Sequence, residues 1–281
     1  MARFTASDGA SIFYEVSGRG RPLLLLHGLM AHGGFWDAQA KLADTHQLIV
    51  PDLRGHGQSR ADLQSLSIAR LSRDMQELSD QLDLRDAVVV GWSLGAAVAW
   101  PLLDGPATAR FAGCVVVDMT PRILNDRDWV LGLSPELIAA RTAAFRGDFE
   151  SFTATAGQAV LAPPLTGEKA RLAAWASAEF ARNDPAAMAA LWDSLAEEDH
   201  RPLLPRIAQP SLIVRGAHSY LYGPETARFL ERSLPDARTI EFSRSGHAPN
   251  LEEPELFNST ISDFTAGLQP ALQVEHARGE M

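Results

Sequence analysis

Short apolar runs alternate with helical patterns along most of this chain, and this alternation constrains the fold more than any other feature. The runs are PLLLLHG at 22–28, QLIVPD at 47–52, AVVVGW at 87–92, GCVVVDM at 113–119, SLIVRG at 211–216 and RTIEF at 238–242. Nearly continuous apolar strands are typical of a parallel sheet covered by helices. A β-hairpin with its turn at Asp8-Gly9 is expected before the first run. We therefore predict an α/β fold with a mostly parallel, eight-stranded sheet.

A single long interval interrupts this alternation. Residues 121–205 contain no convincing strand pattern, but they show helical patterns at 134–147, 148–161, 167–182 and 185–197. Further helices are predicted at 68–82, 94–104, 225–234 and 255–267. We therefore expect a core built from residues 1–120 and 206–268, a helical insertion at 121–205, and a flexible tail over 269–281, where periodicity is absent.

Composition excludes several classes of function. The chain has 281 residues, of which 46% are hydrophobic and 21% charged, as in a soluble protein with one large core. Its formal net charge of −10 argues against a nucleic-acid or anionic-membrane partner. We find no apolar run of the roughly 18 residues that a membrane span needs and no signal-peptide pattern. We expect a cytoplasmic protein of undetermined oligomeric state, with its single cysteine, Cys114, buried.

Ser93 stands where an apolar run meets a predicted helix, in Gly91-Trp92-Ser93-Leu94-Gly95. The pattern G-x-S-x-G between a strand and a helix is typical of the nucleophile elbow, a strained turn that exposes the serine hydroxyl at the edge of a sheet. Side chains at the two glycine positions would collide with the neighbouring strand and helix. The alternative is that the glycines only permit close packing and that Ser93 caps the helix. We favour the nucleophile.

Attack by Ser93 on a carbonyl carbon would require two backbone N–H groups for the developing oxyanion. Leu94, the residue after the nucleophile, supplies one of them. We expect Leu29 to supply the other from the loop after the run at 22–28, because Gly28 leaves the backbone free there. His27 has a rival catalytic interpretation, but we expect it to support this loop by hydrogen bonds.

Four motifs follow one another along the chain: HG at 27–28, PDLRGHGQS at 51–59, GWSLG at 91–95 and SGHAP at 245–249. Together they resemble the α/β-hydrolase superfamily. GWSLG and HAP are similar to the motifs of pimeloyl-acyl-carrier-protein methyl ester esterases and related small carboxylesterases. The resemblance implies that residues 121–205 form a cap over the active site. It also implies that Asp52, Arg54 and His56 belong to a structural turn.

The general base should be a histidine on the loop after the last strand, from which its ring can reach the elbow. Eight histidines compete for this role: His27, His32, His46, His56, His200, His218, His247 and His276. Only His247 lies between the last predicted strand and the last predicted helix. We therefore assign His247 as the base toward Ser93 and then as the acid toward the leaving group, against the alternative of an ordinary surface-loop histidine.

The acidic partner of His247 departs from the family pattern. The resemblance places this acid after the penultimate strand, where the chain has the uncharged Ser219. Asp118 lies at the end of the fourth apolar run, and adjacent strands are about 4.8 Å apart, so its backbone starts one strand nearer to the nucleophile. Glu225 and Asp236 are alternative partners, and Asp118 could instead cap a turn. We favour Asp118 as the acid.

These residues predict a serine hydrolase that cleaves a small-molecule carboxylic ester through an acyl-enzyme. We expect no cofactor and no metal, because the sequence has no motif for either. A thioesterase, lactonase, acyltransferase or perhydrolase would use the same residues, and a non-catalytic small-molecule binder is a further alternative.

Apolar side chains near the elbow suggest what the substrate looks like. Trp92 and Met30 are expected to line the substrate pocket. The insertion adds eight large apolar residues, most of which we expect only to pack the cap: Trp129, Phe145, Phe149, Phe152, Trp175, Phe180, Met188 and Trp192. We expect a preference for short to medium, uncharged acyl groups.

Overall fold

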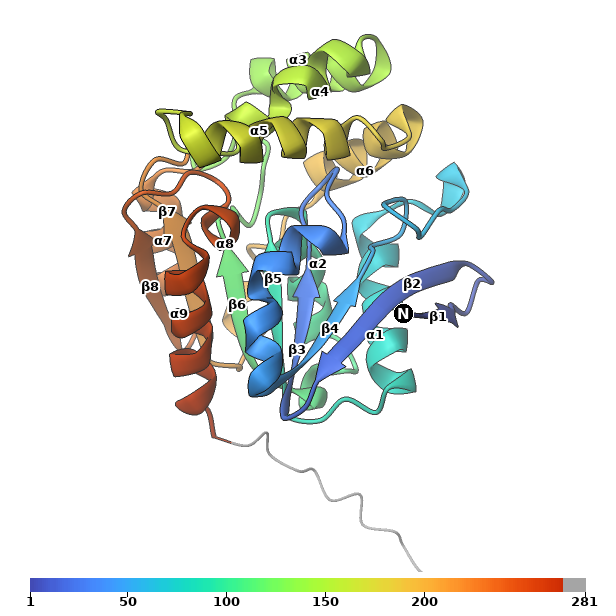
Figure 1. Cartoon of the computed structure of the whole chain (residues 1–281), viewed down its shortest axis with the longest axis vertical. Helices are drawn as coiled ribbons and strands as arrows, with labels where there is room; N and C mark the ends of the chain where they lie inside the picture. Colours follow the sequence, from blue (N-terminus) through green and yellow to red (C-terminus); the bar gives the residue numbers. More distant parts are fainter. Residues whose placement is uncertain (270–281) are drawn as a thin grey trace, which may run out of the picture.

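Eight strands form one sheet at the centre of the molecule (Figure 1), in a computed structural model that describes residues 1–269. The strands are β1 (Ala2–Thr5), β2 (Ser11–Gly18), β3 (Arg21–Leu26), β4 (His46–Pro51), β5 (Ala87–Trp92), β6 (Phe111–Val117), β7 (Ser211–Gly216) and β8 (Ala237–Phe242). Their order is β1-β2-β4-β3-β5-β6-β7-β8. β2 pairs antiparallel with β1 and with β4, and every other pairing is parallel. The predicted fold class is confirmed.

Helices cover both faces of this sheet, which is why β5 and β6 are buried along their whole length. Figure 1 shows η1 (Gly33–Asp44) and α9 (Pro254–Ala266) in front of the sheet, and α1 (Ile68–Gln81) and α2 (Leu94–Asp104) behind it. α7 (Pro224–Ser233) packs against β7 and β8. The remaining short helices of the core are η2 (Leu63–Ser65), η3 (Thr108–Arg110), η4 (Leu204–Arg206) and α8 (Pro249–Glu252).

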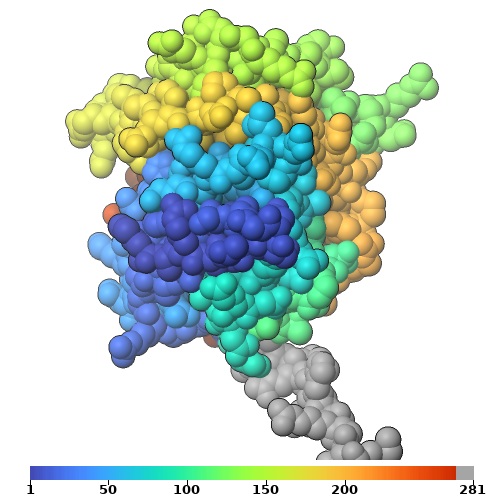
Figure 2. Space-filling view, turned by 90° about the vertical axis from the view of Figure 1, so that its right-hand side faces the viewer, coloured from blue at the N-terminus to red at the C-terminus, as the bar shows by residue number. Residues whose placement is uncertain are grey.

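Four further helices lie above the carboxyl edge of the parallel strands. They are α3 (Pro135–Arg146), α4 (Phe149–Ala159), α5 (Gly167–Phe180) and α6 (Pro185–Glu197). α4 packs against α5 and α3 against α6, and Figure 2 shows them as a layer on top of the core. All four fall inside the interval 121–205, where only helices were predicted. The loops that end the parallel strands therefore face these helices.

Predicted and observed elements differ mainly at their ends. β3 ends at Leu26 and β6 at Val117, so the last two residues of each predicted strand run leave the sheet and form loops at its edge. The helix η1 was not predicted. It begins after His32, whose Nδ1 accepts a hydrogen bond from the backbone N–H of Gly34. The predicted tail lies, from residue 270 onward, outside the described residues.

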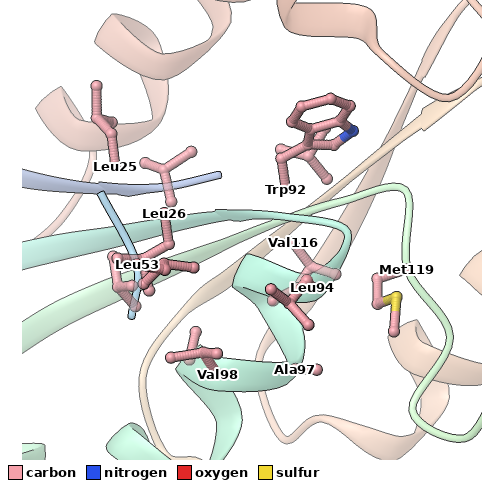
Figure 3. Packing of buried hydrophobic residues seen from close by; sticks show 14 of the residues in the cluster. Leu25, Leu26, Leu53, Trp92, Leu94, Ala97, Val98, Val116 and Met119 are labelled. Atoms are coloured by element: carbon pink, nitrogen blue, oxygen red, sulfur yellow. The ribbon is translucent and has the colours of Figure 1, made fainter. Parts of the chain in front are cut away.

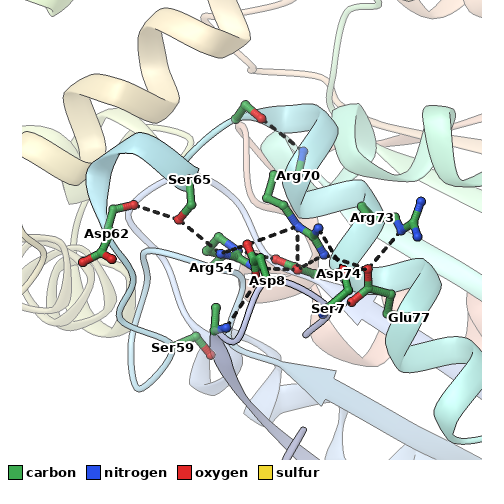
Figure 4. Close-up of polar contacts among 12 residues, drawn as sticks. Ser7, Asp8, Arg54, Ser59, Asp62, Ser65, Arg70, Arg73, Asp74 and Glu77 are labelled. Carbon is green, nitrogen blue, oxygen red and sulfur yellow. Dashed lines mark hydrogen bonds and ion pairs between the residues drawn. The ribbon is translucent and has the colours of Figure 1, made fainter. Parts of the chain in front are cut away.

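The segment after β4 is held by a buried ion-pair network (Figure 4). The side chain of Arg54 is 1% exposed. Its guanidinium pairs with Asp74 of α1 and with Asp8 of the turn between β1 and β2. Arg70 contacts the same Asp74 carboxylate and extends the network to Glu77. Arg54 therefore joins three segments of the chain, as expected for a residue of a structural turn.

Candidate active site

Ser93 occupies a strained turn between β5 and α2. Its backbone angles are φ +53° and ψ −117°, in a region that non-glycine residues rarely adopt. A Cβ atom on Gly95 would lie 2.2 Å from the carbonyl oxygen of Leu26, and one on Gly91 would lie 2.5 Å from the backbone nitrogen of Ala96. Both contacts are with backbone atoms that cannot move aside. The two glycines of the motif therefore permit the turn that raises Ser93 to the edge of the sheet.

His247 lies on the loop that connects β8 to α8. Its backbone N–H donates to the carbonyl of Val160, and its carbonyl accepts from the indole Nε1–H of Trp92 at 2.8 Å. The ring nitrogen Nδ1 is 2.7 Å from Oδ2 of Asp118. Within residues 1–269 the other ring nitrogen, Nε2, has no hydrogen-bond partner, and His247 lines the same cavity as Ser93. His247 is thus held at three points, two on its backbone and one at Nδ1, and Nε2 is left without a partner.

Asp118 is the carboxylate that contacts His247. It follows β6 with a positive φ of 46°, and its side chain is 1% exposed. The Oγ–H of Ser219 donates to the same Oδ2 atom at 2.6 Å. Ser219, at the position where the resemblance implies an acid, therefore donates to the carboxylate that contacts His247. No pattern in the sequence predicts this contact.

Neither of the two alternative acids contacts His247 in the described part of the chain. Glu225 is exposed at the start of α7 and pairs with Arg228. Asp236 precedes β8, and its carbonyl accepts from the backbone N–H of Ser211 at the amino-terminal end of β7. Asp118, Ser93 and His247 follow the last residues of β6, β5 and β8, which all run in one direction. The topology thus brings these three residues to one edge of the sheet.

The two predicted oxyanion donors, Leu29 and Leu94, follow the ends of β3 and β5. Leu94 is the first residue of α2, where a backbone N–H has no partner within the helix. Its side chain points down into the core with Ala97 and Val98 (Figure 3). Leu29 follows β3, lines the cavity, and its N–H makes no backbone hydrogen bond within the described residues. Neither amide therefore has a hydrogen-bond partner among the described residues.

Residues at the end of α5 and just after it contact the loop that carries Leu29. The neighbouring Met30 has a positive φ of 66°, and its carbonyl accepts from the side-chain amide of Asn183 at 2.6 Å. Asn183 lies in the turn between α5 and α6, two of the four helices above the sheet. His32 and Glu179 form a second contact between these parts, with His32 Nε2 3.1 Å from Glu179 Oε2. The helices above the sheet are thereby anchored beside the loop.

A cavity of about 130 Å³ contains both Ser93 and His247. Trp92 and Met30, which were predicted to bind substrate, line it. Of the eight apolar residues singled out in the insertion, four line the cavity and four do not; those that do are Phe145, Phe152, Phe180 and Trp192. Three larger hollows, of about 700, 480 and 450 Å³, are lined by neither Ser93 nor His247. The cavity at the elbow is the one that could present an ester to Ser93.

His27 lies behind the Leu29 loop, fully buried. Its Nε2 accepts the backbone N–H of Leu53 at 2.9 Å, and its Nδ1 lies 2.8 Å from the carbonyl oxygen of Gly28. Burial lowers the pKa of His27 to about 3, so the ring stays neutral. The ring thus supports the loop, as predicted, rather than facing the cavity.

Residues 1–269 contain neither a cluster of potential metal ligands nor a helix that could span a membrane. No group of three or more His, Cys, Asp or Glu side chains is arranged to hold a metal ion there. In the same part of the chain, every helix is too short or too polar to cross a membrane.

Comparisons with known proteins agree with this fold. The model of the alpha/beta hydrolase family matches residues 23–260. This chain is a member of the α/β-hydrolase family. The α/β hydrolase is 32% identical over 257 residues to the pimeloyl-[acyl-carrier protein] methyl ester esterase of Nitrosomonas europaea, covering 89% of this chain and 98% of the relative. The corresponding protein of Vibrio vulnificus is 30% identical, with coverage of 90% and 97%.

Solved structures share the fold of this α/β hydrolase. An esterase from Exiguobacterium antarcticum has a TM-score of 0.89 at 23% identity, covering 94% of this chain and 99% of the other. An enol-lactonase from Burkholderia xenovorans LB400 has a TM-score of 0.84 at 24% identity, with coverage of 94% and 100%. The predictions of an α/β-hydrolase enzyme and of its likeness to carboxylic ester hydrolases are confirmed.

Proposed function

We propose that this α/β hydrolase cleaves carboxylic esters of small to medium, largely apolar acyl groups through an acyl-enzyme on Ser93. The observation that carries the proposal is the 2.7 Å contact between His247 Nδ1 and Asp118 Oδ2, with His247 and Ser93 lining one cavity. A histidine held by a buried carboxylate on one ring nitrogen can accept a proton on the other. Ser93 is the hydroxyl that this nitrogen would serve.

The proposed reaction has two stages. His247 Nε2 takes the proton of the Ser93 hydroxyl as its oxygen attacks the ester carbonyl, and the N–H groups of Leu29 and Leu94 bind the oxyanion. The ester C–O bond breaks, His247 returns the proton to the departing alcohol, and the acyl group remains on Ser93. A water molecule, deprotonated by His247 Nε2, then attacks the acyl carbonyl carbon. The bond from this carbon to Ser93 Oγ breaks, His247 returns the proton to Ser93 Oγ, and the carboxylic acid is released. Asp118 stabilises the imidazolium in both stages, and helices α3–α6 act as the cap over the acyl group.

The relatives suggest which esters to test first. The curated relatives are named for a methyl ester, that of a pimeloyl group on acyl-carrier protein. Methyl esters of linear acyl chains are therefore the first substrates we would offer. Lactones and thioesters would engage the same three residues with a different leaving group, so they belong in the same screen.

Covalent labelling of Ser93 tests the proposal. We expect a fluorophosphonate to label the native protein at Ser93, as located by peptide mass spectrometry, and we expect p-nitrophenyl esters to be hydrolysed. Ser93→Ala should lose both properties, whereas Ser259→Ala, which removes an exposed hydroxyl on α9, should keep both. Folded wild-type protein that is neither labelled nor active on any ester would support a non-catalytic binder instead.

A further inference from the structure

The cavity at the elbow contains one fixed charge. Arg141 of α3 lines it, and the other lining residues include no lysine, aspartate or glutamate. The surrounding walls are apolar and aromatic, as in Phe145 and Phe152. Arg141 is therefore the one permanently charged side chain among these lining residues.

The guanidinium of Arg141 is held in place by two aromatic residues. It lies 5.4 Å from the ring centroid of Trp192 and 5.9 Å from that of Tyr220, and it donates a hydrogen bond to the Tyr220 hydroxyl at 2.6 Å. The indole N–H of Trp192 in turn donates to Thr142 Oγ1. Stacking of this kind pre-orders a planar guanidinium and lowers the entropy that a ligand must remove.

Arg141 has no anionic partner in the described part of the chain. No carboxylate of residues 1–269 lies within 4 Å of its guanidinium, and the Tyr220 hydroxyl takes only one of its five N–H groups. Arg146, one turn further along α3, is paired with Asp193. Arg141 therefore keeps a donor face free beside the cavity, in the geometry that binds carboxylate or phosphate oxygens.

We propose that Arg141 is a specificity-determining residue that binds an oxyanion at the end of the substrate remote from the scissile ester. This inference rests on the proposed function, since it takes Ser93 as the site of the ester. The substrate class is then a linear chain with an ester at one end, a carboxylate or phosphate at the other, and methylene groups against the apolar walls between. The sequence predicts an uncharged acyl group, whereas this inference predicts an acyl group that is apolar in the middle and anionic at its end.

Matched pairs of substrates test the inference. Monomethyl esters of linear dicarboxylic acids, with four to nine carbons in the acid, are compared with methyl esters of the monocarboxylic acids of equal length. For wild type we expect kcat/KM to favour the anionic ester at least tenfold at one chain length, mainly through KM, and to lose part of this preference at high salt. A parallel series with a terminal phosphate in place of the carboxylate tells which oxyanion is preferred.

Two arginine variants isolate the cause. Arg141→Met should reduce the anionic-to-neutral ratio of kcat/KM to within about twofold of one, and Arg141→Lys should give an intermediate ratio. Arg146→Met removes the same charge from the same helix outside the cavity and should keep both the wild-type ratio and the wild-type activity. As a binding readout, linear dicarboxylates should quench the tryptophan fluorescence of Ser93→Ala but not that of Ser93→Ala with Arg141→Met.

The outcomes separate the two proposals. A wild type that hydrolyses neutral and anionic esters equally well, or an Arg141→Met variant that keeps the preference, overturns the inference about Arg141 and leaves the esterase proposal standing. In that case Arg141 serves only to tie α3 to Tyr220. A wild type that hydrolyses no ester of either series overturns the proposed function itself.

Discussion

Two donors share one oxygen of Asp118: the Nδ1–H of His247 at 2.7 Å and the Oγ–H of Ser219 at 2.6 Å. Ser219→Ala removes one of them, so the carboxylate attracts the imidazolium proton more strongly. A hydrogen bond of this kind is worth about 1 kcal/mol, so we expect kcat at pH 8 to stay within about tenfold of wild type. The acidic limb of the kcat/KM–pH profile should move to higher pH. Ser219→Thr keeps the hydroxyl and should restore the wild-type profile, and a Ser219→Ala profile that overlays the wild-type one would contradict the role.

Single residues differ in how far the sequence reveals their roles. Ser93 and His247 could be placed because each follows a recognisable strand, and Asp118 because neighbouring parallel strands have a fixed spacing. The Ser219 contact and the hold of Asn183 on the Met30 carbonyl could not be predicted. They depend on the course of irregular loops, which no apolar periodicity encodes.

The β5–α2 element depends on close backbone approach at Gly95. A Cβ atom there would lie 2.2 Å from the carbonyl oxygen of Leu26 in β3. We expect Gly95→Ala to lower the free energy of unfolding by about 3 kcal/mol or more, as measured by urea denaturation, because the helix must shift away from the sheet. Gly223→Ala, where no atom lies within 4 Å of the added methyl group, is the control and should change stability by less than about 1 kcal/mol. Equal effects of the two substitutions would show that close approach at the elbow is not needed.

At the level of whole elements, the parallel strands and long helices follow from apolar periodicity, whereas η1 does not. This helix is held by tertiary contacts, since Phe35 and Trp36 are buried and the Gln39 side-chain amide donates to the carbonyl of Asn250. Packing of α3–α6 over the sheet likewise depends on contacts between distant segments. Local patterns could therefore give the helices of the interval 121–205 but not the cavity that they close.

The whole molecule buries several histidines in neutral form. Burial lowers the pKa of His27 and of His56 to about 3, and that of His200 to about 4. Below pH 6.5 the unfolded chain binds protons at these sites that the folded chain does not, so stability is fully present above pH 6.5 and is lost as the pH falls toward 4. Each such histidine contributes a slope of up to about 1.4 kcal/mol per pH unit.

His200 provides the test of this acid sensitivity. Its ring packs 5.3 Å from that of Trp100, and its buried Nε2 has no hydrogen-bond partner in the described residues. His200→Phe keeps a ring of similar shape and removes one titrating group. We expect the slope of unfolding free energy against pH, from urea denaturation between pH 6 and 4.5, to fall by about 1 kcal/mol per unit. Near pH 8, where both rings are neutral, the difference in unfolding free energy between the two proteins should not change with pH. Curves of unfolding free energy that stay parallel at all pH values would refute the account.

The most direct test of the central claim is kcat of Asp118→Asn on an ester that wild type hydrolyses. The amide keeps the shape of the side chain but favours the wrong tautomer of His247, so we expect kcat to fall by roughly 10³- to 10⁴-fold, as for the equivalent change in a serine protease. Circular dichroism and urea denaturation establish that the variant is folded. Ser219→Asp in the Asp118→Asn background should recover part of the rate, since it restores a carboxylate beside His247. A folded Asp118→Asn protein with near-normal kcat would contradict the assignment of Asp118, His247 and Ser93 as one catalytic unit.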